Sequence, residues 1–247
     1  MIVATFNVHR WQDARGLDNV GRVRTLLMSH MVDVVGLQEV TDPQPLRRLA
    51  ADLNLQISKN QYGNAILSRY PLQGEASIPL GERRRHRKGT PRERAICATI
   101  SVDDQPVRMV VLHLDHVQAE TRIAQLEAVR RALGKSLLPE LWMGDFNALT
   151  RADYSPHQWS TIAAVREKNQ WEPPRTVVSE WMQRAGFVDC WTLAGRTKPI
   201  ATCRFNTRID YLWASPAWAA AWAVNACHAV PADASDHRMV VADMHNR

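Results

Sequence analysis

Short apolar runs that end in polar residues recur along the chain. Runs of this length, entered or left through turn-forming residues, are typical of strands that are buried on both faces. Residues 103–106 (Asp-Asp-Gln-Pro) predict a turn between two of them. We therefore expect strands at residues 2–6, 33–40, 65–68, 95–102, 107–114, 141–143, 208–213 and 239–242.

Apolar residues at helical spacing separate several of these runs. Between Ile123 and Leu133 they recur at intervals of three or four residues among Arg and Glu, which predicts an amphipathic helix over 120–133. Weaker patterns predict helices over 17–31, over 45–53 with a start near Asp42-Pro43, and over most of 153–187, with a break at Pro173-Pro174.

Strands and helices are thus mixed along the whole sequence, which predicts an α/β fold. The 247 residues contain no fixed-period repeat, low-complexity tract or linker, so we expect residues 1–247 to form one domain. Hydrophobic residues make up 45% and charged residues 23% of the chain, which excludes disordered and fibrous classes.

The sequence gives no indication of a membrane segment. Its most apolar region, residues 213–230, contains Pro216, Asn225 and His228 and is too polar to span a bilayer. The first apolar run is interrupted at Asn7, unlike a secretory leader. We expect an unprocessed cytoplasmic protein, a monomer, without stable membrane insertion.

The positive charge is concentrated in one stretch. Residues 81–94 hold seven Lys or Arg and two Glu, a net charge of +5 out of +6 for the whole chain. A protein that binds polyanions over a broad face would spread its positive charge over that face. The concentration of charge in this stretch indicates a basic loop that binds one anionic ligand. A solvated surface loop is the alternative.

The four cysteines lie far apart and form no CxxC pair, so neither a zinc site nor a redox motif is indicated. We expect Cys97, Cys190, Cys203 and Cys227 to be buried free thiols, with a Cys190–Cys203 disulfide as the alternative.

Eight polar residues stand at or next to the ends of predicted strands. Carboxylate and amide oxygens are the ligands that Mg²⁺ prefers, and cysteine is absent from this set. The set indicates a phosphoesterase that uses Mg²⁺ or Mn²⁺, although its two histidines leave a His-ligated metal open. Its members are Asn7, Glu39, His113, Asp145, Asn147, Asp210, Asp236 and His237.

Residues 144–147 (Gly-Asp-Phe-Asn) follow an apolar run and contain two of these polar residues. Alone, the pair Asp145 and Asn147 is as typical of a self-capping Asx turn as of a catalytic site. The other polar strand ends favour the catalytic interpretation.

Seven short motifs, taken in order, resemble those of the endonuclease/exonuclease/phosphatase superfamily, which includes pancreatic-type deoxyribonucleases. The motifs are Thr-Phe-Asn-Val-His (5–9), Leu-Gln-Glu-Val (37–40), Gly-Asn-Ala-Ile-Leu-Ser-Arg (63–69), His-Leu-Asp-His (113–116), Gly-Asp-Phe-Asn (144–147), Arg-Ile-Asp-Tyr (208–211) and Ser-Asp-His (235–237).

This resemblance implies a four-layer α/β sandwich, with two mixed β-sheets packed face to face and helices outside. It implies that Glu39 is the principal metal ligand, with Asn7 and Asp236 close enough to help. Asp145 would deprotonate the attacking water, and Asn147 would fix Asp145 and the phosphate.

By the same resemblance, His237 would contact the scissile phosphate while Asp210 holds its imidazole, and His113 would supply a second donor. His113 matches the histidine of deoxyribonucleases, where abasic-site endonucleases carry a tyrosine. The role of His116 stays open between a site residue and a structural hydrogen-bond partner.

Residues 92–95 (Arg-Glu-Arg-Ala) resemble the DNA-contacting stretch of deoxyribonucleases, so Arg92 becomes a candidate phosphate contact, with Arg94 as its alternative. Asn64 is the second predicted phosphate contact.

These features together predict a divalent-metal-dependent phosphodiesterase that hydrolyses nucleic acid, preferably DNA, as an endo- or exonuclease. The alternative is a phosphoesterase for a phosphoinositide, a sphingomyelin-like lipid or another small phosphorylated substrate. In that alternative Trp159, Trp171 and Trp181 would face a lipid interface, but core packing is the expectation for these side chains.

Overall fold

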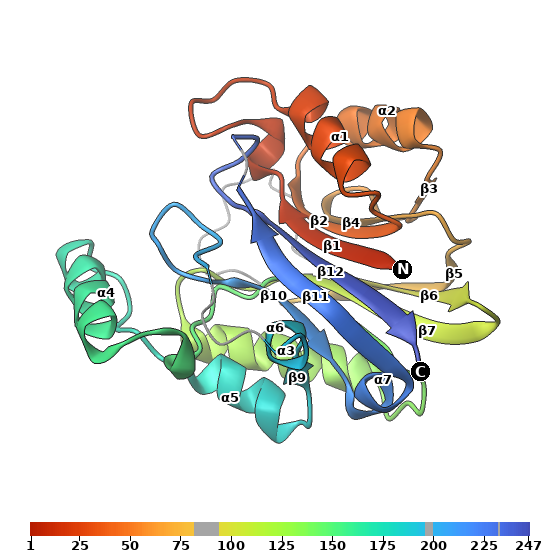
Figure 1. The fold of residues 1–247 in the computed structure, drawn as a ribbon. Helices are drawn as coiled ribbons and strands as arrows, with labels where there is room; N and C mark the ends of the chain where they lie inside the picture. Colours follow the sequence, from red (N-terminus) through yellow and green to blue (C-terminus); the bar gives the residue numbers. More distant parts are fainter. Residues whose placement is uncertain (82–93, 196–199, 232) are drawn as a thin grey trace.

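The computed structural model describes residues 1–81, 94–195, 200–231 and 233–247. Two mixed six-stranded sheets pack face to face, and helices cover their outer faces (Figure 1). This arrangement confirms the predicted four-layer α/β sandwich.

The first sheet joins both ends of the chain. β1 (Ile2–Asn7) lies between β12 (Met239–Asn246), to which it is antiparallel, and β2 (Val34–Val40), to which it is parallel. α1 (Val20–Ser29) and α2 (Pro43–Leu53) cover its outer face. β4 (Gly63–Ser68) and β3 (Gln56–Ile57) complete one side, and β11 (Trp222–Val230) forms the other edge.

The second sheet has the order β5-β6-β7-β8-β10-β9. α3 (Ala119–Leu133) and α5 (Val177–Arg184) pack on its outer face. Its strands are β5 (Gln73–Pro79), β6 (Arg94–Val102), β7 (Gln105–His113), β8 (Glu140–Asp145), β9 (Val188–Asp189) and β10 (Asp210–Ala214). The remaining short elements are η1 (His9–Trp11), η2 (Arg151–Asp153), α4 (Pro156–Lys168), α6 (Cys190–Leu193) and α7 (Pro216–Ala221).

The inner strands are mainly apolar because both of their faces are covered. In β8, Met143 points into the core between the sheets, while Trp142 packs under the outer helices. The sheets approach closely at Gly36 of β2, where a Cβ atom would lie 2.7 Å from the side chain of Val111. A glycine at this place therefore sets the spacing between the two sheets.

Three expectations about elements need correction. α1 begins only at Val20, because the Asp13 carboxylate accepts the N–H groups of Arg15 and Leu17 and holds the preceding residues in a turn. β10 begins at Asp210 rather than at residue 208. The four edge strands β3, β5, β9 and β11 were not predicted; β5, for example, is half exposed and lacks an apolar run.

The four cysteines are buried free thiols, as expected. No Cys190–Cys203 disulfide therefore forms. Among the described residues, no helix is both long enough and apolar enough to cross a membrane.

The tryptophans of 153–187 lie outside the core. The side chain of Trp171 is 42% exposed, and those of Trp159 and Trp181 are half-buried, so the expectation of core packing is wrong for Trp171 and only half met for the others. Trp159 lies in α4, which projects away from the sandwich at the left of Figure 1 and has no buried residue, whereas Trp181 lies in α5 and packs against the core of the second sheet.

Candidate active site

The strand register gathers the predicted side chains at one end of the two sheets. Asp145 is the last residue of β8 and pairs with His113 at the end of parallel β7 and with Asp210 at the start of antiparallel β10. Asn7 ends β1 of the facing sheet. Parallel β7 and β8 end at the same edge of the sheet, and antiparallel β10 begins there. The side chains of Asn7, His113, Asp145 and Asp210 therefore converge without any long loop.

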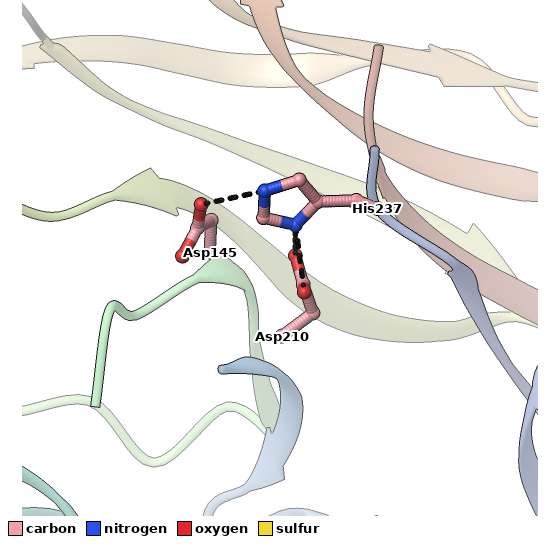
Figure 2. Close-up of side chains that lie close together, drawn as sticks. All are labelled: Asp145, Asp210 and His237. Atoms are coloured by element: carbon pink, nitrogen blue, oxygen red, sulfur yellow. Dashed lines mark hydrogen bonds and ion pairs between the residues drawn. The ribbon is translucent and has the colours of Figure 1, made fainter. Parts of the chain in front are cut away.

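Asp210 and His237 form a hydrogen-bonded pair beside Asp145. The imidazole Nδ1 of His237 lies 2.9 Å and 3.2 Å from the two carboxylate oxygens of Asp210. Its Nε2 lies 3.8 Å from Oδ2 of Asp145, so the ring stands between two carboxylates (Figure 2). The three side chains come within 4.8 Å of one another.

These neighbours decide the charge of the histidine. Burial lowers the pKa of His237, but the carboxylates of Asp210 and Asp145 outweigh it and hold the pKa well above its usual range. The imidazole is therefore a cation at neutral pH, with both nitrogens available as donors.

Asp145 is buried, and its environment opposes its charge. Burial first and the carboxylate of Asp210 second raise its pKa to about 7, against the lowering effects of His237, the Asn147 N–H and Asn7. A carboxylate with such a pKa can accept a proton from water near neutral pH.

Asp145 is held in position from several sides. The backbone N–H of Asn147 donates to its Oδ1 at 3.0 Å, and Nε2 of His113 lies 3.6 Å from its Oδ2. Asn147 is itself in the left-handed region, with φ 48°, and its NH₂ group donates to the carbonyl of Leu114. The self-capping turn considered for this stretch therefore exists, and it also aims Asp145 into the cluster.

Asn7 joins Asp145 to Glu39. Its Nδ2 lies 3.3 Å from Oε1 of Glu39 and 3.3 Å from Oδ2 of Asp145, while its Oδ1 accepts the N–H of His9. The amide thus presents its NH₂ group rather than its oxygen to these carboxylates, which differs from the metal-ligand role predicted for it.

Glu39 sits at an irregular point of β2. The register of β2 against β4 shifts between Leu37 and Val40, and Glu39 has φ 58°. This conformation is costly for a residue with a Cβ atom and is typical of functional sites. It leaves the carboxylate 25% exposed, with the exposed guanidinium of Arg10 at 3.6 Å.

Asp236 lies in the segment before β12 and pairs with His9. The Nδ1 of His9 is 2.6 Å from Oδ1 of Asp236. Ser235 fixes this segment, since its hydroxyl donates to the carbonyl of Asn7 and accepts the N–H of His237. His9 was missing from the predicted site, although its position two residues after Asn7 was an available signal.

Asn64, one of the two predicted phosphate contacts, does not join this cluster. Asn64 is completely buried, and its NH₂ group donates to the carbonyl of Arg94, so its side chain offers no face to a substrate. Arg92 lies outside the described residues.

A buried arginine, which sequence reasoning did not select, supports the start of β10. The guanidinium of Arg208 bonds to carboxylates of Asp153 and Asp189 at 2.8 Å and 2.6 Å and stacks on Tyr211. Arg208 thereby links η2 and β9 to the start of β10.

The model of the endonuclease/exonuclease/phosphatase family matches residues 4–237. The chain belongs to this family. Its members are hydrolases that act on phosphoesters. No curated protein sequence matches the chain.

Solved structures share the fold. A functionally unknown conserved protein from Enterococcus faecalis gives a TM-score of 0.73 at 21% identity, covering 100% of each chain. An endonuclease/exonuclease/phosphatase from Beutenbergia cavernae gives 0.74 at 22% identity, covering 100% of this chain and 71% of that one. A mannosyl-6-phosphatase from Bacteroides thetaiotaomicron gives 0.71 at 15% identity, with 99% of each chain covered.

Enzymes of the endonuclease/exonuclease/phosphatase family generally depend on a divalent metal, and oxygen ligands are available here. Asp145, Asp210 and His237 are close enough together to hold an ion, but Nδ1 of His237 is already bonded to Asp210. The carboxylate of Glu39 is partly exposed and, among the described residues, pairs with the exposed guanidinium of Arg10, so it better fits a hard metal ion.

Proposed function

We propose that the chain is a phosphodiesterase that hydrolyses nucleic acid, with DNA as its preferred substrate. The observation that carries the proposal is the Asp210–His237–Asp145 arrangement, which joins a cationic donor and a carboxylate of raised pKa at the strand ends. A phosphodiester needs both, because it is anionic and resists attack by water.

Each side chain then has a defined task. Asp145 accepts the proton of the attacking water, and Asn147 and Asn7 keep its carboxylate oriented. His237 donates Nε2–H to a phosphate oxygen, while Asp210 keeps the imidazole charged and fixed. His113 supplies a further donor on the same side of Asp145.

A bound Mg²⁺ or Mn²⁺ would neutralise charge on the phosphate oxygens. Glu39 is the residue that would hold it, with Asp236 as the second carboxylate. The carboxylate of Glu39 is 25% exposed, which leaves part of it accessible to an ion and suits this role.

The preference for nucleic acid rests on charge. β5 and β6 are paired at Pro79 and Arg94, and β6 begins at the same end of the sheet at which β7 ends in His113. The strongly basic stretch of the sequence is inserted at this point of the chain. A dense positive charge in one stretch of the sequence favours a polyanionic substrate.

Substitution of the central residues tests the proposal. We expect Glu39→Ala and His237→Ala to reduce DNA cleavage at least about 100-fold in Mg²⁺, because each removes charge stabilisation from the transition state. Asp145→Asn should cleave slowly and still bind metal, as measured by calorimetric titration. Glu127→Ala on the outer surface of α3 is the matched control. Full activity in both the Glu39 and His237 variants would refute the assignment.

A small or lipid phosphoester is the second candidate substrate. It is favoured by the exposed Trp171 and by the fold shared with a mannosyl-6-phosphatase. Turnover of plasmid DNA, RNA, a phosphoinositide panel and sugar phosphates, in Mg²⁺ and in Mn²⁺, distinguishes the candidates. Hydrolysis of the lipids or sugar phosphates alone would replace nucleic acid as the substrate.

A further inference from the structure

Two exposed aromatic side chains from distant parts of the sequence meet on the surface. Trp171, in the segment between α4 and α5, is 42% exposed, and Phe205, in the segment before β10, is 45% exposed. Their ring centroids are 5.0 Å apart and their planes are nearly perpendicular, at 84°. We call Trp171 and Phe205 the aromatic pair.

On one side of the pair, Phe205 lies in a segment that is bonded to Asp236 and His237. Cys203 forms a β-bridge with His237, and the N–H of Arg204 donates to the carbonyl of Asp236 at 3.0 Å. Phe205 follows Cys203 by two residues, a distance of at most about 7 Å along the backbone. The ring therefore stands at the rim of the active site.

The Trp171 side is anchored to the same end of the second sheet. Its neighbour Glu172 accepts the N–H of Ala119 at 2.9 Å and pairs with the buried guanidinium of Arg122 at 2.7 Å. Ala119 begins α3, only six positions after His113. Both rings are thus fixed to elements that also position catalytic residues, so little side-chain freedom remains to be lost on binding.

A positive charge accompanies the pair. The guanidinium of Arg204 lies over the Phe205 ring at 4.9 Å, and its Nε is 3.7 Å from Oδ2 of Asp236. An exposed ring with an adjacent cation is the combination that binds single-stranded nucleic acid, in which bases stack on aromatics and the backbone is held by charge.

We propose that the aromatic pair stacks a nucleobase next to the scissile phosphate, with Arg204 contacting the phosphate of the same nucleotide. This proposal rests on the proposed nuclease function. It assigns the pair a part in substrate choice: a strand with an accessible base is bound better than a fully stacked duplex or a substrate without a base.

Binding to two oligomers of equal length and charge tests it. One is a fluorescein-labelled oligothymidylate, and the other is an oligomer of abasic tetrahydrofuran units. Both are titrated by fluorescence anisotropy in Mg²⁺ against protein that carries His237→Ala, so that no cleavage interferes. We expect tighter binding of the oligothymidylate. Trp171→Ala and Phe205→Ala should each weaken it about tenfold and leave the abasic oligomer unchanged.

Two further variants separate stacking from structural damage. Trp171→Phe keeps an aromatic face and should retain most of the preference for the oligothymidylate. Trp181→Ala, which removes a half-buried tryptophan beside Gly134 and Lys135 at the other end of α3, should change neither affinity. Circular dichroism spectra and melting curves show that the variants are folded.

The outcomes separate the two proposals. Equal affinity for the two oligomers, or losses of the same size on both, would overturn the stacking proposal alone. If protein with an intact His237 cleaves neither DNA nor RNA, the proposed nuclease function fails, whereas the binding comparison still reports on the aromatic pair.

Discussion

At the scale of single residues, the surroundings of Asp145 raise its proton affinity and lower the stability of the folded protein when it is ionised. Burial and the carboxylate of Asp210 raise its pKa to about 7. A base with this pKa is well matched to proton transfer at neutral pH. The same environment makes the ionised form a source of instability in the folded protein, as is common at functional sites.

We expect Asp145→Asn to stabilise the metal-free protein at pH 8 by about 2–6 °C in melting temperature. The pKa of Asp145 is about 7 in the folded state and 3.8 as its ordinary value, so ionisation above pH 7 favours unfolding. The gain should therefore be full at pH 8, shrink as the pH falls below 7, and vanish near pH 4.

Scanning calorimetry in EDTA at a series of pH values measures this difference. Asp52→Asn, at a carboxylate that is 42% exposed, should leave the melting temperature almost unchanged across the series. A lower melting temperature for Asp145→Asn at pH 8 would contradict the destabilised charge.

At the scale of elements, the site depends on how closely β7 and β8 approach. Gly144 has φ 145°, and a Cβ atom there would lie 1.9 Å from the carbonyl oxygen of Leu112 on β7. No side chain fits into this space without moving one of the strands. Because Asp145 is the next residue, the glycine also sets the direction of its carboxylate.

Gly144→Ala should reduce the free energy of unfolding by more than about 3 kcal/mol, because backbone rather than a side chain blocks the new methyl group. Gly21→Ala is the matched control. It lies in α1 with nothing within 4 Å of its Cβ position, and alanine should stabilise the helix by about 0.5–1 kcal/mol. Urea denaturation followed by circular dichroism compares them, and equal midpoints for wild type and Gly144→Ala would contradict the expectation.

The sequence predicted the inner strands well because both faces are buried and the runs are therefore apolar. It missed the edge strands β3, β5, β9 and β11; in β5 the exposed edge position leaves no apolar pattern. In the site, it predicted the gathering of Asp145, Asp210 and His237, since polar residues at ends of neighbouring strands must meet. It could not predict that Asn64 turns inward to Arg94 or that His9 reaches Asp236, because these contacts depend on side-chain directions.

At the scale of the whole molecule, the core between the sheets fixes the geometry of the candidate active site. Asn7 and Glu39 belong to the first sheet, and His113, Asp145 and Asp210 belong to the second. The 3.3 Å contact between Nδ2 of Asn7 and Oδ2 of Asp145 crosses from one sheet to the other. A change in sheet spacing would therefore separate the Asn7 amide from the Asp145 carboxylate.

The dense core also protects the thiols. All four cysteines are buried, and burial raises the pKa of Cys97 to about 11, so its thiol is protonated at pH 8 and unreactive. We expect native protein to react with less than about one equivalent of a disulfide reagent at pH 8, and protein unfolded in guanidinium without reductant to show four thiols. Two thiols after unfolding would indicate a disulfide and contradict the structure.

The antiparallel pairing of β1 with β12 has a consequence for synthesis of the protein. Ile2 lies opposite Asp243, and His9 meets Asp236 across 227 positions of sequence. A chain growing on the ribosome therefore makes Asn7 and Glu39 long before Asp236 and His237. Closing such a long loop costs conformational entropy, and β1 cannot pair with β12 until β12 has been synthesised. Until residues 236–246 have emerged and paired, the candidate site of the nascent chain lacks Asp236 and His237 and is incomplete.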